Sequence, residues 1–109
     1  MKTNWTKNDL KTYTLIYCAN ADFTESKVEI DFIKSIIKNA NFDQLHKEFE
    51  LDNDYQSIQK MQAAIQENDY SDAEIDQLIA DIKTLFLTDN DYDILEQNML
   101  LGLKRIFKG

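Results

Sequence analysis

The chain has 109 residues, of which 43 % are hydrophobic, and its formal net charge is −8. This length predicts a single domain over residues 1–109, and the hydrophobic content is enough for a core of ordinary size. The acidic charge disfavours binding to nucleic acid or to anionic membranes, because both require basic surfaces. It favours instead the binding of cations or of a basic protein surface.

Composition limits the class of protein further. There is no Pro, there are two Gly and there is one Cys, so we expect helices joined by short polar turns and no intrachain disulfide. The first residues lead into a polar stretch, and no apolar run reaches the roughly 18 residues of a membrane span. The expectation is a cytoplasmic protein with no signal peptide and no membrane insertion.

Hydrophobic residues recur at helical spacing along the chain, which predicts an all-α fold, a single compact bundle of about six helices. Three helix starts carry a capping-box pattern, in which a hydroxyl residue and an acidic residue three positions later bind each other's backbone N–H groups. Asp54 is expected to cap the fourth helix. The capping pairs are Thr6 with Asp9, Ser26 with Glu29, and Ser71 with Glu74. The expected helices cover roughly residues 6–20, 26–39, 42–49, 54–68, 71–88 and 93–107.

The last of these helices is predicted to be the most buried. Its apolar residues cover most of its circumference, as in a helix that other helices surround. Gly102 lies in its middle, where glycine costs about 1 kcal/mol relative to alanine, so we expect a neighbouring backbone to pass close by. The apolar residues are Ile94, Leu95, Met99, Leu100, Leu101, Leu103, Ile106 and Phe107.

Little in the sequence suggests catalysis. Cys18 lies on the apolar face of the first helix and is predicted to be a buried hydrophobic residue. His46 is the only His; it stands between charged residues and is predicted to lie on the surface. One His cannot build a zinc site, and no nucleotide-binding or metalloprotease motif occurs. We therefore expect a protein that is not an enzyme.

One short pattern occurs twice. Asp22 is followed seven residues later by Glu29, and the same pair recurs 67 residues further along as Asp89 and Glu96. Each pair spans an acidic loop between two predicted helices, so the chain holds two related helix–acidic loop–helix units. Clustered carboxylates of this kind are ligands for hard divalent cations.

This layout resembles that of TerB-like domains, the all-helical fold of the tellurite-resistance protein TerB. Their hallmark is a helix, a short Ala-Asp-Gly loop and a helix with Glu seven residues after the Asp, near both ends of the domain. Asp22 with Glu29, and Asp89 with Glu96, match those two sites, although neither copy keeps the glycine. The resemblance implies a divalent-metal site formed by these four residues. It also implies a non-catalytic role, through protein contacts, in a stress-response or envelope-associated assembly.

Other interpretations of the carboxylates stand beside this one. Glu29 and Glu96 occupy positions at which Glu favours helix capping, and Asp22 and Asp89 would complement helix macrodipoles, so stability alone explains them. A carboxylate-based hydrolase is a weaker alternative, because no other polar catalytic group accompanies the acids.

A third interpretation is an acidic protein–protein interaction module without a metal. The fourth helix has an unusually uncharged outer face, which is a candidate docking surface. Exposed apolar residues contiguous with that face would favour this interpretation. The residues of the face are Gln56, Gln59, Gln62 and Gln66.

Overall fold

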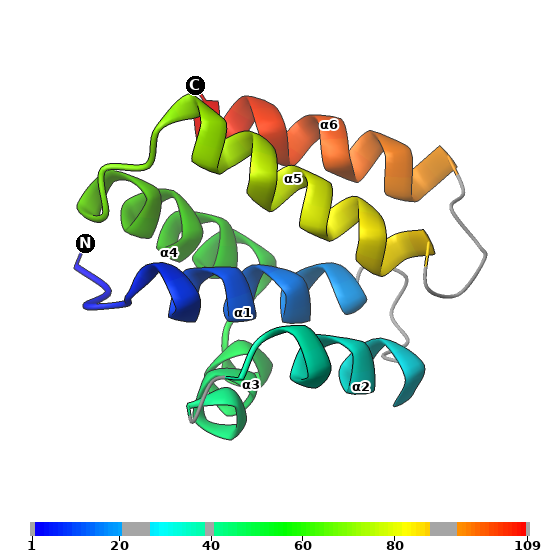
Figure 1. The fold of residues 1–109 in the computed structure, drawn as a ribbon. Coiled ribbons are helices and arrows are strands. Elements are labelled where there is room, and N and C mark those ends of the chain that lie inside the picture. The colour runs from blue at the N-terminus through cyan, green and yellow to red at the C-terminus, as the bar shows by residue number, and fades with distance from the viewer. Residues whose placement is uncertain (1, 21–26, 39–40, 88–93, 109) are drawn as a thin grey trace.

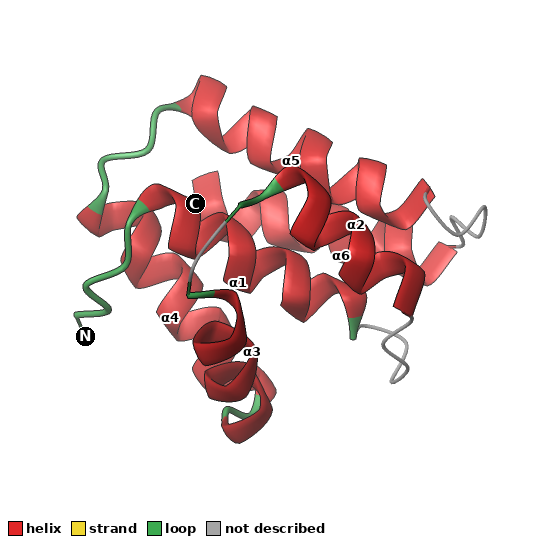
Figure 2. Ribbon diagram, turned by 60° about the horizontal axis from the view of Figure 1, so that its bottom comes forward, coloured by secondary structure: helices red, strands yellow, loops and turns green. Residues whose placement is uncertain are grey.

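Six helices make up the part of the chain that the structure describes (Figure 1). This computed structural model describes residues 2–20, 27–38, 41–87 and 94–108. Those residues contain no strand (Figure 2), which confirms the predicted all-α class. The helices are α1 (Lys7–Ala19), α2 (Lys27–Ile36), α3 (Phe42–Leu51), α4 (Asp54–Glu67), α5 (Asp72–Leu87) and α6 (Ile94–Lys108).

Helix α1 lies at the centre of the bundle. It contacts α2, α3, α4 and α5, and Figure 1 shows it between the α5–α6 pair and the α2–α3 pair. Its residues Leu10, Leu15 and Ile16 have no exposed surface. Thr12 is also fully buried, and its hydroxyl donates a hydrogen bond to the carbonyl of Asn8 one turn earlier at 2.8 Å. A helix with several polar residues is therefore the one around which the others pack.

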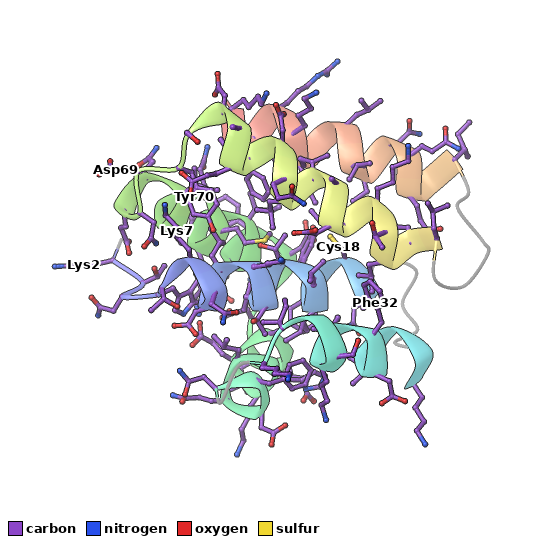
Figure 3. All side chains as sticks on the ribbon, viewed as in Figure 1. Lys2, Lys7, Cys18, Phe32, Asp69 and Tyr70 are labelled. Atoms are coloured by element: carbon purple, nitrogen blue, oxygen red, sulfur yellow. The ribbon has the colours of Figure 1, made fainter. Side chains whose placement is uncertain are left out.

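Buried apolar side chains from all six helices form a common core. The radius of gyration is 12.8 Å, close to the roughly 13 Å expected of a compact chain of this length. Cys18, labelled in Figure 3, is 2 % exposed and belongs to this core, as predicted. Among the described residues, none of the helices has both the length and the apolar character that crossing a bilayer would require.

Helix α6 is not the most buried helix, so that prediction was wrong. It packs mainly on α5 and has a smaller contact with α4. Leu100, Leu103 and Phe107 face the core, whereas Ile94 and Leu101 are 70 % and 61 % exposed. Apolar residues around a helix indicate burial only where neighbours cover each side, and no helix of the described part of the chain covers the outer side of α6.

The expected close approach at Gly102 is also absent from the described residues. A Cβ atom placed on Gly102 would meet no other atom within 4 Å. We expect Gly102→Ala to stabilise the protein by about 0.5–1 kcal/mol, since alanine has the higher helix propensity and loses less backbone entropy on folding. Urea unfolding of the two proteins measures the difference, and a destabilised variant would show that the glycine is needed for packing.

Two of the predicted capping boxes are confirmed. Thr6 and Asp9 bind each other's backbone N–H groups at 3.0 and 3.1 Å, and the pair Ser71 and Glu74 does the same at 3.1 and 3.2 Å. The predicted cap Ser26 lies outside the described residues.

The start of α4 differs from the prediction, in which Asp54 caps the helix. Asn53 is the cap, and it forms a capping box with Gln56 at 2.8 and 2.9 Å. Asp54 becomes the first helical residue. Both side chains can cap a helix, so sequence alone did not decide between neighbours. The one-residue shift leaves the Asp54 carboxylate available for a contact with α1.

The segment before α1 is held against the end of α4. The Glu67 carboxylate accepts hydrogen bonds from the backbone N–H groups of Thr3 at 2.9 Å and Asn4 at 3.3 Å, and from the Thr3 hydroxyl at 2.8 Å. These bonds lower the pKa of Glu67. The Trp5 ring then packs on the Tyr13 ring, with the centroids 4.6 Å apart. Residues that are distant in sequence thus close one side of the core.

Candidate functional site

The predicted metal ligands fall largely outside the residues that the structure describes. Asp22 and Asp89 lie outside them, as does the side chain of Glu29. Glu96 is half-buried in the first turn of α6. Among the described side chains, no group of three or more His, Cys, Asp or Glu residues is placed to hold a metal ion. The predicted site therefore remains a prediction.

The helix ends that flank the two predicted loops can be compared. The end of α1, the start of α2, the end of α5 and the start of α6 lie at the same end of the molecule, on the right in both Figure 1 and Figure 2. Contacts of α1 with α2 and α5, and of α2 with α5, agree with this arrangement. The helix ends that border the two predicted acidic loops therefore lie at one end of the bundle (Figures 1 and 2).

A polar network that the sequence did not indicate lies where α1 meets α3 and α4. The Tyr13 hydroxyl donates a hydrogen bond to the Asp52 carboxylate at 2.7 Å and lies 2.9 Å from the Ser57 hydroxyl. The Lys60 ammonium donates to both Asp52 oxygens, at 2.9 and 2.8 Å, and to Glu48 at 3.1 Å. Asp52 directly follows α3, and Ser57 and Lys60 lie on consecutive turns of α4. The α3–turn–α4 unit therefore supplies both groups that contact the Tyr13 hydroxyl.

Burial explains the electrostatics of this network. Desolvation raises the pKa of the Tyr13 hydroxyl well above its usual value, and the bond to Ser57 opposes that rise only in part. Burial alone would lower the pKa of Lys60, but its hydrogen bonds to Asp52 and Glu48 outweigh this effect and raise it. The Asp52 side chain is 9 % exposed, and its charge is balanced by Lys60. The network is satisfied within the protein, as buried polar groups require.

We expect Asp52→Ala to destabilise the protein by about 2 kcal/mol, because it leaves the Tyr13 hydroxyl and the partly buried Lys60 without their shared acceptor. The matched control is Glu50→Ala, since Glu50 pairs with His46 one turn away on the same helix and its side chain is 63 % exposed. The control should change stability by less than about 0.5 kcal/mol. Denaturant unfolding measures both variants, and equal costs would show that the network adds nothing.

His46 differs in part from its predicted surface position. Its side chain is 26 % exposed and pairs with Glu50 at 2.9 Å. Its ring stacks on Phe42, with the centroids 6.0 Å apart. This arrangement is a packing contact at the edge of the core.

A hollow of about 320 Å³ opens beside the network, and we call it the α3–α4 hollow. Its inner surface is largely apolar and aromatic, and the Tyr17 and Phe49 rings meet there edge to face with centroids 6.2 Å apart. At its rim, the Tyr17 hydroxyl donates to the Asp54 carboxylate at 2.6 Å. The residues that line it are Tyr17, Asn20, Phe49, Asp52, Asn53, Asp54, Ser57 and Met99.

Two large apolar side chains are exposed on the same turn. Leu51 directly precedes Asp52 and is 82 % exposed, and Tyr55 directly follows Asp54 and is 69 % exposed. Tyr55 lies on the outer side of α4, where its hydroxyl accepts a hydrogen bond from the Gln59 side chain at 2.9 Å. Tyr55 is therefore contiguous with the Gln-rich face, which was the arrangement expected of an interaction module.

Comparison of the chain with protein-family models, with curated proteins and with solved structures found no match. The candidate site therefore rests on the geometry of the chain itself. In the described residues, the polar network has its partners within the fold and accounts for stability. The α3–α4 hollow is open to solvent and, at about 320 Å³, it is larger than two other hollows of about 240 and 250 Å³ in the described part of the chain.

Proposed function

We propose that this chain is a non-catalytic, TerB-like helical domain that binds a protein partner at the α3–α4 turn. The observation that supports this most directly is the exposure of Leu51 and Tyr55, which adjoin in the chain the lining residues Asp52 and Asp54 of an open hollow. The cytoplasmic location and the context of tellurite resistance, a stress response or an envelope-associated assembly are proposed from the resemblance alone.

The turn has the composition of a protein-binding surface. Single exposed apolar residues are ordinary, but here two of them lie within one five-residue stretch, and the residues between them help to line a hollow that contains two aromatic rings. Interface centres are enriched in Tyr, Phe and Met and have a polar rim. Tyr17, Phe49 and Met99 provide the first feature, and the carboxylate of Asp54 contributes to the second.

The charge of the site supports a protein partner over a nucleic acid or a hydrolytic reaction. Asp52 and Asp54 at the hollow would repel phosphate groups. Asp52 and Glu48 are both bound to Lys60, so these carboxylates hold a cation and are not poised to move a proton in a substrate. The proposal therefore gives the hollow a binding role.

Site-specific photo-crosslinking in cells tests the proposal. Tyr55 is replaced by p-benzoylphenylalanine, and the matched control carries the same group at Gln77, an exposed position on α5 away from the hollow. We expect position 55 to give a discrete adduct, identified by mass spectrometry, that position 77 does not give. Adding Leu51→Asp should abolish this adduct. Equal labelling at both positions, or an adduct that Leu51→Asp leaves unchanged, would contradict the proposal.

A second candidate function is binding of a divalent cation by Asp22, Glu29, Asp89 and Glu96. Its support is the common location of the four helix ends that flank the two predicted loops (Figures 1 and 2). Carboxylates gathered at one end would repel one another, and a cation such as Ca²⁺, Mg²⁺ or Mn²⁺ would relieve that repulsion.

Thermal unfolding with Ca²⁺, Mg²⁺, Mn²⁺ or Zn²⁺ at constant ionic strength tests the cation. A cation bound only by the folded state stabilises it by about 2.7 kcal/mol at a hundredfold excess over Kd, which raises Tm by roughly ten degrees for a domain of this size. The double variant Asp22→Asn with Asp89→Asn should lose a saturable shift of this kind. A small shift that NaCl reproduces in both proteins reflects screening and would exclude the cation.

A further inference from the structure

We propose that the α3–α4 hollow receives a cationic side chain, arginine or lysine, from the protein partner. This inference rests on the proposed function and names the chemistry that the partner must carry. Three properties of the hollow lead to it: an acidic group without a cation, an aromatic and thioether inner surface, and a volume suited to one long side chain.

The acidic group is Asp54. Its carboxylate accepts one hydrogen bond, from the Tyr17 hydroxyl at 2.6 Å, and within the described part of the chain it has no basic partner. By comparison, Asp76 pairs with Lys108 and Asp81 pairs with Lys11, each at 2.8 Å. The Asp54 carboxylate can therefore accept further hydrogen bonds at the rim of the hollow.

The inner surface suits the rest of such a side chain. The edge-to-face pair of Tyr17 and Phe49 offers aromatic surface to a cation, which favours Arg more often than Lys. Met99, from α6, adds a polarisable thioether that adapts to an alkyl chain. A long basic side chain can bury its methylene groups on this surface while its charged end stays at the rim.

Volume and overall charge agree with the same occupant. A hollow of about 320 Å³ is at the small end of the range of ligand pockets, which suits one long side chain. Leu51 and Tyr55 are exposed and adjoin the lining residues Asp52 and Asp54 in the chain, so they are available to apolar residues of the partner. The net charge of −8 steers a basic segment toward the protein.

NMR titration with arginine methyl ester tests the chemistry directly, with the ester of the neutral analogue citrulline as the control ligand. We expect saturable shifts of the Tyr17, Phe49 and Met99 signals with the arginine ester, and a binding affinity that falls as NaCl rises. Asp54→Asn should weaken binding about tenfold. The matched variant is Asp72→Asn, because Asp72 is also the exposed first residue of a helix and lies outside the hollow.

A second variant keeps the test valid if Asp54→Asn alters the start of α4. Met99→Arg leaves Asp54 in place and supplies a guanidinium from α6, so it should block the ester. Equal binding of the two esters, or binding that neither Asp54→Asn nor Met99→Arg weakens, would overturn the inference.

The outcomes separate this inference from the proposed function. If position 55 crosslinks a partner and Asp54→Asn does not reduce the adduct, the turn binds a partner but the cationic side chain is excluded. If the arginine ester binds and position 55 gives no adduct, the hollow takes a cation and the protein-binding role fails. Loss of the adduct in Asp54→Asn, with Asp72→Asn unchanged, supports both.

Discussion

Replacing Ile16 with alanine should destabilise the protein by about 2–5 kcal/mol, among the largest effects expected of a single truncation in this chain. Ile16 has no exposed surface and lies on α1, which four other helices contact. Truncation loses the transfer free energy of the removed methyl groups, and it leaves a cavity because neighbours on several sides cannot all collapse into it.

Leu101→Ala is the matched control for this prediction. It also removes a large aliphatic side chain from a helix, but Leu101 is 61 % exposed on the outer side of α6, so the expected change is within about 0.5 kcal/mol. Urea unfolding with a common slope measures both. If Leu101→Ala were the more damaging change, α6 and not α1 would be the helix that organises the core.

The second large effect is expected at alkaline pH. Burial raises the pKa of Tyr70 to about 12, and it raises the pKa values of Tyr13 and Tyr17 further. An unfolded tyrosine titrates near pH 10, so above that pH the unfolded chain releases protons that the folded chain retains. The contribution of these three tyrosines to the free energy of unfolding is therefore constant below about pH 10. It is lost as the pH rises from there toward the raised values.

The size of this loss follows from the linkage. Tyr13, which is fully buried, contributes a slope of at most about 1.4 kcal/mol per pH unit. Tyr17 and Tyr70 are half-buried and contribute less because solvent screens them. We expect a total loss of about 2–3 kcal/mol between pH 10 and 11.

Unfolding free energies between pH 8 and 11 measure the slope. Tyr13→Phe destabilises the protein at every pH because it removes two hydrogen bonds, but its slope above pH 10 should be flatter by about 1 kcal/mol per pH unit. Ile65→Val, a core change without a titrating group, controls for lowered stability. A slope in Tyr13→Phe equal to that of the control would show that this hydroxyl ionises alike in both states.

Local features of the fold could be predicted from the sequence because they depend on nearby residues. The capping boxes at Thr6 and Ser71 require side chains only three positions apart. The burial of Cys18 follows from its place on an apolar face. The all-α class follows from helical periodicity and the absence of proline.

Which helix is the most buried could not be predicted, because burial depends on which helices pack on each side of it. In the sequence, α6 has apolar residues on most of its circumference, which suggested burial. Helix α1 is the more buried helix, although its buried residues include the polar Thr12 and Thr14. Thr12 satisfies its hydroxyl on its own helix, so its polarity in the sequence concealed its burial. Leu101 is the opposite case, an apolar residue over which no helix packs.

The candidate site was missed for a similar reason. Asp54 was predicted only to cap a helix. The contacts that Asp52 and Asp54 make depend on Tyr13 and Tyr17, which lie 39 and 37 residues away in the chain. One signal was present: Leu51 and Tyr55 put large apolar residues beside the α3–α4 turn, where solvation favours polar ones.

The central position of α1 has a consequence for synthesis of the chain on the ribosome. Helix α1 is made early, but its partners α3, α4 and α5 follow later, and α5 ends 68 residues after Ala19. At about 5–20 residues per second, the apolar side chains of α1 wait roughly 3–14 s for their last neighbour. During that interval the apolar side chains of α1, among them Leu10, Leu15 and Ile16, lack the cover that α5 gives to α1 in the folded chain, and transiently exposed apolar surface of this kind is prone to aggregation.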